Sequence, residues 1–278
     1  MEYAFRLVNV FAESPLAGNP LCVFEDARGI DDKTMQALAL QFNLSETTFL
    51  LPSTLATARV RIFTPTFEMP FAGHPTLGSA HVVRNLNNAG DAVTLEMRAG
   101  VIPVEAEGDV WTLQANAPKH RPLELDRETL AMTLGLAPND LAEAPPLWVD
   151  TGSEQLIVPL AHADAVRRAA PRAELMQKHA STGQRAMAYV FARDGDHVLA
   201  RFFFPKHGAV LEDPGTGSAC ANLGGWLLAT GARLPQRLRI DQGEAVGRPC
   251  RLGLEVTDDR RIRVSGRVIE IARGTLRL

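Results

Sequence analysis

Glu46 lies where a carboxylate could transfer protons. It belongs to the run NLSETTFL, residues 43–50, between the expected end of a helix and an apolar strand. A carboxyl group beside such a strand is often partly buried, and desolvation then moves its pKa towards the working pH. General acid–base catalysis needs such a group. A solvent-facing glutamate at the start of a strand is the alternative, and the residue types alone do not decide between the two.

Two turns rich in glycine and proline are the second feature with chemical potential. Residues 74–80 read HPTLGSA and residues 213–219 read DPGTGSA, each at the expected start of a helix. Free backbone N–H groups and the positive end of the helix dipole favour an anion at such a place. Small residues such as Gly217 and Ser218 let a ligand approach the backbone closely. A carboxylate-bearing substrate would fit there, whereas the alternative is two glycine-rich turns without a ligand.

The same two turns indicate an internal duplication. RIFTP at residues 61–65 resembles RFFFP at residues 201–205, and the HPTLGSA and DPGTGSA turns follow in the same order. Four of the seven positions in these turns are identical, and the match places His74 opposite Asp213. Two matched blocks in one order predict a repeated architecture.

Short strands must position these turns. Many runs alternate apolar and polar residues, as half-buried strands do. The clearer helices are expected over residues 31–43, 75–85 and 218–230, the last ended by Gly231. We therefore predict an α+β protein with two similar lobes, residues 1–115 and 116–278, each with one main buried helix. Two placements of the last strand stay open: in the second lobe, or crossing back to the first.

Composition and motif searches exclude several classes of protein. The 278 residues are 46% hydrophobic and 22% charged with a net charge of -3, which disfavours a broad nucleic-acid-binding face. No signal peptide or membrane span is expected, so a cytoplasmic protein is predicted. Walker, dinucleotide, nucleophile-elbow and HExxH motifs are incomplete, and we expect neither a metal nor a cofactor. The odd number of widely spaced cysteines predicts buried free thiols: Cys22, Cys220 and Cys250.

Taken together, these motifs resemble the phenazine-biosynthesis PhzF-like isomerase family. The resemblance rests on NLSET at residues 43–47, PFAGHPTLG at 70–78, EDPGTGSA at 212–219 and the stretch around residues 242–249, and it runs along the whole chain. It implies a diaminopimelate-epimerase-like fold: two pseudo-symmetric lobes, each a curved, mostly antiparallel sheet around a central helix, with the active site between them. Related epimerases use two cysteines as acid and base, and no cysteine occupies the matching turns here.

The resemblance also implies roles for individual residues. Glu46 would remove a proton from one carbon of the substrate and return it to another. His74 and Asp213 would bind polar groups and assist proton movement. The expected hydrogen-bond donors to the substrate carboxylate are Gly73, Gly217 and Ser218.

The function expected from this resemblance is a cofactor-independent isomerase acting on a small carboxylate-bearing metabolite. A homodimer is compatible with it, and no nucleic-acid or membrane partner is expected. One alternative is a non-catalytic protein that binds a small molecule or a partner on the same scaffold. Another is a cysteine-dependent epimerase, which the missing thiols disfavour. Glu46, His74 and Asp213 favour an enzyme, because a binding protein needs no acid/base pair.

Overall fold

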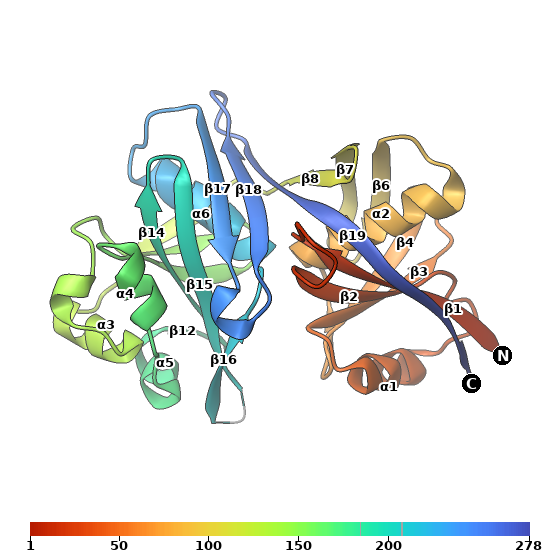
Figure 1. The fold of residues 1–278 in the computed structure, drawn as a ribbon, viewed down its shortest axis with the longest axis horizontal. Coiled ribbons are helices and arrows are strands. Elements are labelled where there is room, and N and C mark those ends of the chain that lie inside the picture. Colours follow the sequence, from red (N-terminus) through yellow and green to blue (C-terminus); the bar gives the residue numbers. More distant parts are fainter. Residues whose placement is uncertain (184, 207) are drawn as a thin grey trace. The chain divides into compact units, whose positions relative to one another are not determined.

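Strands interrupted by helices make up most of the computed structural model, which describes residues 1–183, 185–206 and 208–278 (Figure 1). The α+β composition expected from the sequence is confirmed. The chain divides into unit 1, Met1–Gln114 with Ser265–Leu278, and unit 2, Ala115–Val264. We propose these units as the counterparts of the two lobes expected from the sequence.

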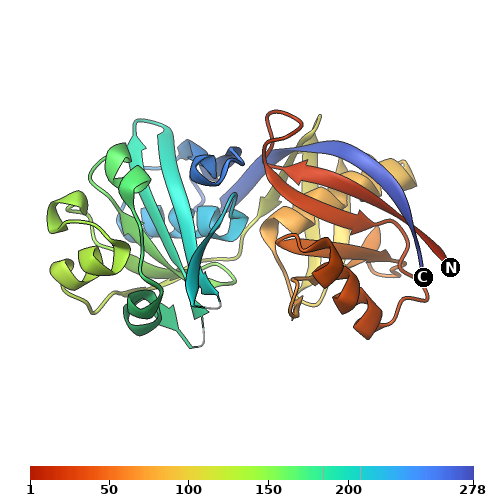
Figure 2. The same cartoon turned by 60° about the horizontal axis from the view of Figure 1, so that its bottom comes forward.

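Unit 1 is a sheet that closes on itself around one helix. Hydrogen-bonded neighbours follow one another in the order β1, β2, β3, β4, β6, β7, β8, β19 and back to β1. Figure 2 shows β19 running beside β1. The bounds are β1 Glu2–Val10, β2 Asn19–Phe24, α1 Asp32–Phe42, β3 Glu46–Leu51, β4 Ala58–Phe63, β5 Glu68–Met69, α2 Gly73–Asn87, β6 Ala92–Met97, β7 Gly100–Glu107, β8 Val110–Gln114 and β19 Ile262–Arg277.

Helix α2 is the central helix of unit 1. Every residue from His74 to Val83 is buried, so the helix has no solvent-facing side along this stretch. It contacts strands all round the sheet, including β1, β3, β6 and β8. A helix buried on every side belongs to a core rather than to a surface. Its first turn is therefore held in a fixed position by the surrounding strands.

Unit 2 repeats this plan with more helical cover. Hydrogen-bonded ladders join β9, β10, β11, β14, β15, β17 and β18 in that order, and β16 pairs with β15. Helix α6 contacts β9, β10, β11 and β18, and its residues from Ala219 to Leu227 are buried. The bounds are β9 Lys119–Pro122, α3 Arg127–Leu134, η1 Pro138–Asp140, β10 Leu147–Asp150, β11 Glu154–Pro159, α4 Ala163–Arg168, α5 Ala173–His179, β12 Ser181–Thr182, β13 Arg185–Ala186, β14 Ala188–Asp194, β15 His197–Lys206, β16 Ala209–Asp213, α6 Gly217–Ala229, β17 Gln236–Gln242, η2 Glu244–Val246 and β18 Cys250–Val256.

The two units share one order of elements. In unit 1, β2 and β3 are parallel, β3 and β4 antiparallel, and β4 and β6 parallel; β11, β14, β15 and β17 repeat these relations. A partly buried ion pair marks the same place in both. Arg61 of β4 binds Glu68 of β5, and Arg201 of β15 binds Glu212 of β16. The order of the elements therefore supports the predicted duplication.

The residue-by-residue match predicted between the two turns is wrong. Strand pairing sets Phe63 opposite Glu68 and Phe203 opposite Glu212, so Asp213 occupies the place of Met69. Helices α2 and α6 begin at Gly73 and Gly217, so the counterpart of His74 is Ser218.

The slip of five residues arose because prolines and small residues recur in both turns for different structural reasons. Pro75 is the third residue of α2, whereas Pro214 lies in the loop before α6. Gly78 lies inside α2, where an added Cβ would be 2.6 Å from Leu21 Cδ2, whereas Gly217 begins its helix. The identical letters therefore hold different positions in the two repeats.

Candidate active site

Glu46 is positioned by the end of helix α1 and the start of strand β3. The Asp31 side chain caps α1 by accepting a hydrogen bond from Thr34 N at 2.8 Å, and the helix ends at Asn43 in the left-handed conformation. The chain then turns into β3, where Glu46 is paired in parallel register with Leu21. The Glu46 side chain is 15% exposed, and the four residues that follow it are buried. The carboxyl is therefore partly buried.

His74 lies beside this carboxyl. It is the second residue of α2, its side chain is 6% exposed, and its Nε2 lies 3.4 Å from Glu46 Oε2. The ring hydrogen-bonds the backbone of Pro20, which has only a carbonyl to offer, so the imidazole donates. Since Nε2 has no hydrogen bond within the described part of the chain, Nδ1 is the donor.

Burial keeps the His74 ring neutral. Desolvation lowers the pKa of His74 from 6.5 to about 3, and the hydrogen bond to the Pro20 carbonyl opposes this shift without overcoming it. A neutral ring that donates through Nδ1 presents a lone pair at Nε2. Unit 1 thus places a hydrogen-bond acceptor next to the Glu46 carboxyl, where it can accept a hydrogen bond from Glu46 when that carboxyl is protonated.

The first turns of α2 and α6 offer backbone donors. Neither N-cap residue, Ala72 or Thr216, caps its helix with its own side chain. Gly73 and Gly217 are the first helical residues, and their N–H groups belong to the set that has no partner within a helix. The helix dipole adds positive potential there. These two predicted donors thus occupy equivalent places at the two helix starts.

Asp213 ends strand β16 and is held by a hydroxyl and an amide. Its Oδ2 accepts a hydrogen bond from Thr216 Oγ1 at 2.5 Å. Gln242 Nε2 donates to the Asp213 carbonyl at 2.8 Å and to Thr216 Oγ1 at 3.0 Å. Gly243 permits the close approach, since an added Cβ would be 2.4 Å from the Pro214 carbonyl oxygen. Asp213 is thereby fixed as an acceptor at Oδ2.

Ser218, the second residue of α6, is bound by residues that sequence reasoning missed. Gln155 Nε2 donates to Ser218 Oγ at 2.9 Å, and Asn222 Nδ2 donates to Gln155 Oε1 at 2.8 Å. Gln155 and Asn222 are 2% and 0% exposed. The sequence offered one indication of these two residues, namely an amide side chain within an apolar run. Gln155 precedes LIVP in β11, and Asn222 interrupts the small and apolar residues of α6.

The structure thus brings the predicted residues together in two sets, one in each unit. Unit 1 holds Glu46 and His74 in contact, with Gly73 beside His74 in the chain. Unit 2 holds Asp213, Gly217 and Ser218 around the start of α6. Within residues 1–183, 185–206 and 208–278, no cluster of three or more His, Cys, Asp or Glu side chains is arranged to hold a metal ion.

The predicted packing role of the cysteines agrees with their environment. All three are free and buried: Cys22, Cys220 and Cys250. Burial raises the pKa of each thiol, so the reactive thiolate is disfavoured. Thiol-based acid–base chemistry is therefore not supported by these side chains.

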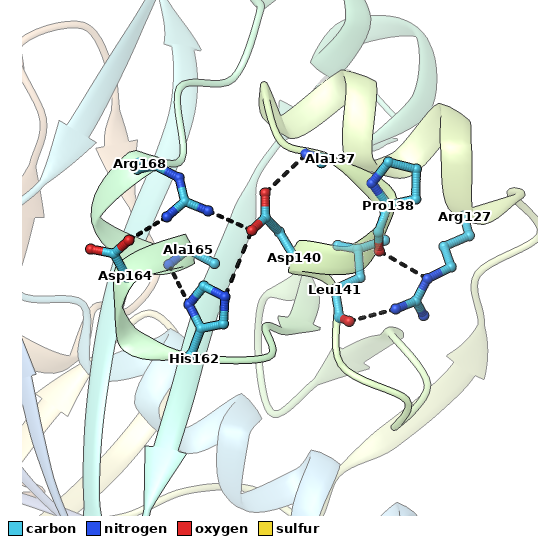
Figure 3. A network of polar contacts seen from close by, with 9 residues as sticks. All are labelled: Arg127, Ala137, Pro138, Asp140, Leu141, His162, Asp164, Ala165 and Arg168. Atoms are coloured by element: carbon cyan, nitrogen blue, oxygen red, sulfur yellow. Dashed lines mark hydrogen bonds and ion pairs between the residues drawn. The ribbon is translucent and has the colours of Figure 1, made fainter.

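A second polar cluster of unit 2 has a structural role (Figure 3). Asp140 of η1 accepts from Arg168 of α4 at 2.5 Å and from Ala137 N at 3.0 Å, and His162 Nε2 lies 3.8 Å from it. Arg127 of α3 donates to backbone carbonyls, including that of Pro138 at 2.9 Å. The open cavity beside Arg127, about 410 Å³, is lined by Arg127, Asn139, Leu141, Ala142, Glu143 and Ala161. Because Arg127 already donates its hydrogen bonds to backbone carbonyls, we assign this cluster to the packing of α3, η1 and α4 against one another.

In the described part of the chain, no helix combines the length and the apolar character needed to cross a lipid bilayer.

Comparison with known proteins adds a family match to this geometry. Residues 8–274 match the family model of phenazine biosynthesis-like proteins. An uncharacterized isomerase of Pasteurella multocida is 39% identical over 99% of this chain and 94% of its own length. The trans-2,3-dihydro-3-hydroxyanthranilate isomerase of Pseudomonas chlororaphis is 34% identical over 98% of each chain. The crystal structure of a PhzF-family protein of Bacillus anthracis superposes with a TM-score of 0.90 at 25% identity, covering both chains completely.

Proposed function

Given that this chain belongs to the phenazine biosynthesis-like family, we propose that it shifts a proton within a small carboxylate-bearing metabolite, without a cofactor and with Glu46 as acid/base. The predicted resemblance and the diaminopimelate-epimerase-like fold are confirmed, and the chain is an isomerase. The substrate and the roles of individual residues are the proposed part.

One observation carries the proposal: the contact between the Glu46 carboxyl and a neutral imidazole. Glu46 Oε2 and His74 Nε2 are 3.4 Å apart, and burial lowers the pKa of His74 to about 3. Catalytic hydrogen bonds are often long without substrate and shorten when it binds. The pair can therefore store one proton, which is what a proton shuttle between two carbons requires.

The proposed reaction balances without an oxidant or a co-reactant. The Glu46 carboxylate removes a proton from a carbon activated by neighbouring unsaturation, and that C–H bond breaks. The electron pair moves along the unsaturated system, and the Glu46 carboxylic acid returns its proton to a different carbon, where a new C–H bond forms. While Glu46 carries the proton, His74 Nε2 accepts a hydrogen bond from it and keeps the acid oriented.

The other predicted residues are assigned to the same substrate. We propose that the N–H groups of Gly73 and Gly217 and the hydroxyl of Ser218 donate hydrogen bonds to its carboxylate. Asp213, an acceptor at Oδ2, would bind an amino or hydroxyl group. Negative charge that develops during proton removal would be stabilised by such preorganised donors.

Deuterium exchange followed by proton NMR tests the proposal. The protein is incubated in D2O with a panel of unsaturated cyclic acids and amino acids, including the compound for which the Pseudomonas chlororaphis relative is named. We expect deuterium at a single carbon and isomerisation of at least one compound. Glu46→Gln should reduce kcat by about 10²–10⁴-fold with little change in KM, because the residue acts in the transition state.

A matched control separates catalysis from loss of a charge. Glu107→Gln removes one carboxylate from an exposed position on strand β7 and should leave exchange unchanged. Full activity of Glu46→Gln would refute the acid/base role of this residue. Binding of a panel compound without exchange would instead support a non-catalytic binding function.

A further inference from the structure

The side chain of Asn222 has an orientation that the backbone dictates. Asn222 Oδ1 lies 2.9 Å from the backbone nitrogen of Thr151, and its Nδ2 lies 2.9 Å from the carbonyl oxygen of Ser153. A backbone N–H can only donate and a carbonyl can only accept. If the amide were flipped, its NH2 group would face the N–H of Thr151 and its oxygen would face the carbonyl of Ser153, so both hydrogen bonds would be lost.

This orientation passes to Gln155. Asn222 Nδ2 also donates to Gln155 Oε1 at 2.8 Å, so the oxygen of Gln155 must face Asn222 and its Nε2 must face Ser218. Both amide side chains are at most 2% exposed, so bulk water cannot replace these partners. The backbone groups that bind Asn222 thus fix the direction of each hydrogen bond in the series from Asn222 through Gln155 to Ser218.

The consequence falls on the hydroxyl of Ser218. Its Oγ accepts from Gln155 Nε2 at 2.9 Å, so its own proton must point away from Gln155. We propose that Gln155 and Asn222 are positioning residues that keep the Ser218 hydroxyl proton directed away from Gln155 and available for a hydrogen bond to the substrate carboxylate. This inference rests on the proposed function and extends it to the selection of the group bound by Ser218.

Comparison of the two repeats shows that the fold itself does not need this polar pair. Strand registers place Leu21 of β2 at the position of Gln155 in β11, and the common helix starts place Gly78 at the position of Asn222. Leu21 and Gly78 are in apolar contact in unit 1. The same place in the repeat is therefore filled by hydrocarbon in one unit and by hydrogen-bonded amides in the other.

The amides accompany a change in the residue that they serve. The counterpart of Ser218 in unit 1 is His74, which the Pro20 carbonyl orients. Unit 1 thus uses its helix start to present an acceptor to Glu46, and unit 2 uses the equivalent place to present a donor. The freed proton of Ser218 needs a partner that accepts a hydrogen bond, which a carboxylate oxygen does and an ammonium group does not.

Neutron diffraction from perdeuterated crystals tests the orientation without any ligand. We expect deuterium density on the Gln155 amide nitrogen facing Ser218, and a Ser218 hydroxyl deuteron that points away from Gln155. A Gln155 oxygen facing Ser218, or a hydroxyl deuteron directed at Gln155, would overturn the inference whatever the substrate proves to be.

A double-mutant cycle tests the effect on binding, with 3-hydroxyanthranilate as a stable aromatic carboxylate probe measured by titration calorimetry. Gln155→Met keeps the length of the side chain and removes its polarity, and Ser218→Ala removes the hydroxyl. A hydrogen bond to a charged group predicts that either change weakens binding by about ten- to hundredfold. The double variant should bind no more weakly than Ser218→Ala alone.

The possible results separate the two proposals. If Gln155→Met weakens binding as much in the Ser218→Ala protein as in the parent, Gln155 does not act through Ser218 and the positioning role is refuted. Circular dichroism and thermal melting show whether each variant is folded. If the parent protein does not bind the probe, the proposed substrate class loses support, and the neutron map alone decides whether Ser218 is a fixed donor.

Discussion

The neutral state of His74 makes the stability of this protein sensitive to acid. In the folded state burial lowers the pKa of His74 to about 3, whereas the unperturbed value is 6.5. Between these two values the unfolded chain binds a proton at His74 and the folded chain does not, so the free energy of unfolding falls as the pH falls. At about 1.4 kcal/mol for each unit of pKa, the loss at this side chain is about 3 kcal/mol by pH 4.

Urea unfolding at pH 7, 5 and 4 measures this loss against a variant that cannot titrate. His74→Asn keeps an N–H donor close to the position of Nδ1, from which it can still bind the Pro20 carbonyl. At pH 7 the parent should be the more stable protein. Its advantage over His74→Asn should shrink by about 3 kcal/mol between pH 7 and pH 4, because only the parent has to keep this buried group unprotonated.

Parallel pH curves for the two proteins would refute a buried neutral imidazole. The neighbouring carboxyl needs its own control, since a carboxylate 3.4 Å from Nε2 favours the protonated ring. Repeating the comparison with Glu46→Gln in both proteins removes that charge. If the stability difference between the His74 and His74→Asn proteins shrinks by the same amount with and without Glu46→Gln, the effect is due to burial. If it shrinks more in the Glu46→Gln background, Glu46 holds the ring protonated in the parent.

Three further substitutions have outcomes that follow from packing. Conversion of Cys22, Cys220 and Cys250 together to alanine should leave kcat within about twofold, because none of the three is a reactive thiolate. A thiol reagent that stops turnover of the folded protein would contradict this expectation. Gly78→Ala would place its Cβ 2.6 Å from Leu21 Cδ2, and a loss of about 1–3 kcal/mol is expected in urea unfolding; no loss would show that this contact relaxes freely. Arg201→Met leaves the Glu212 side chain without its partner and should lower the free energy of unfolding by about 3–5 kcal/mol. Arg237 is the control: its side chain is 82% exposed, so Arg237→Met should change the free energy of unfolding by less than about 0.5 kcal/mol. Equal losses in the two variants would refute a stabilising role of the pair between Arg201 and Glu212.

Local sequence was enough to predict the elements that carry the candidate residues. A helix end followed by an apolar strand placed Glu46, and glycine with proline near a helix start placed His74 and Gly217. These signals lie within a few residues of the side chains that they position. The hydrogen bond between Gln155 and Asn222 joins residues 67 positions apart, and no local pattern could reveal it.

The errors came from features that short motifs do not encode. The hairpin between β15 and β16 is longer than that between β4 and β5, so a match of letters could not give the match of positions. Helices α3, α4 and α5 have six to eight residues and were not predicted. Helices of that length show too few turns to establish an apolar period, and their stability comes from packing on the unit 2 sheet.

Strand β19 has a consequence for the order in which the protein can fold during synthesis. Unit 1 begins with Met1, but its sheet is closed by residues after Ser265, which pair with β1 and β8. The ribosome must therefore make all of unit 2 before the closing strand emerges. Until then β1 and β8 present unpaired edges, the kind of surface that recruits foreign strands. The unit that is translated first is thus the last to be completed, and two of its strand edges stay unpaired while unit 2 is being made.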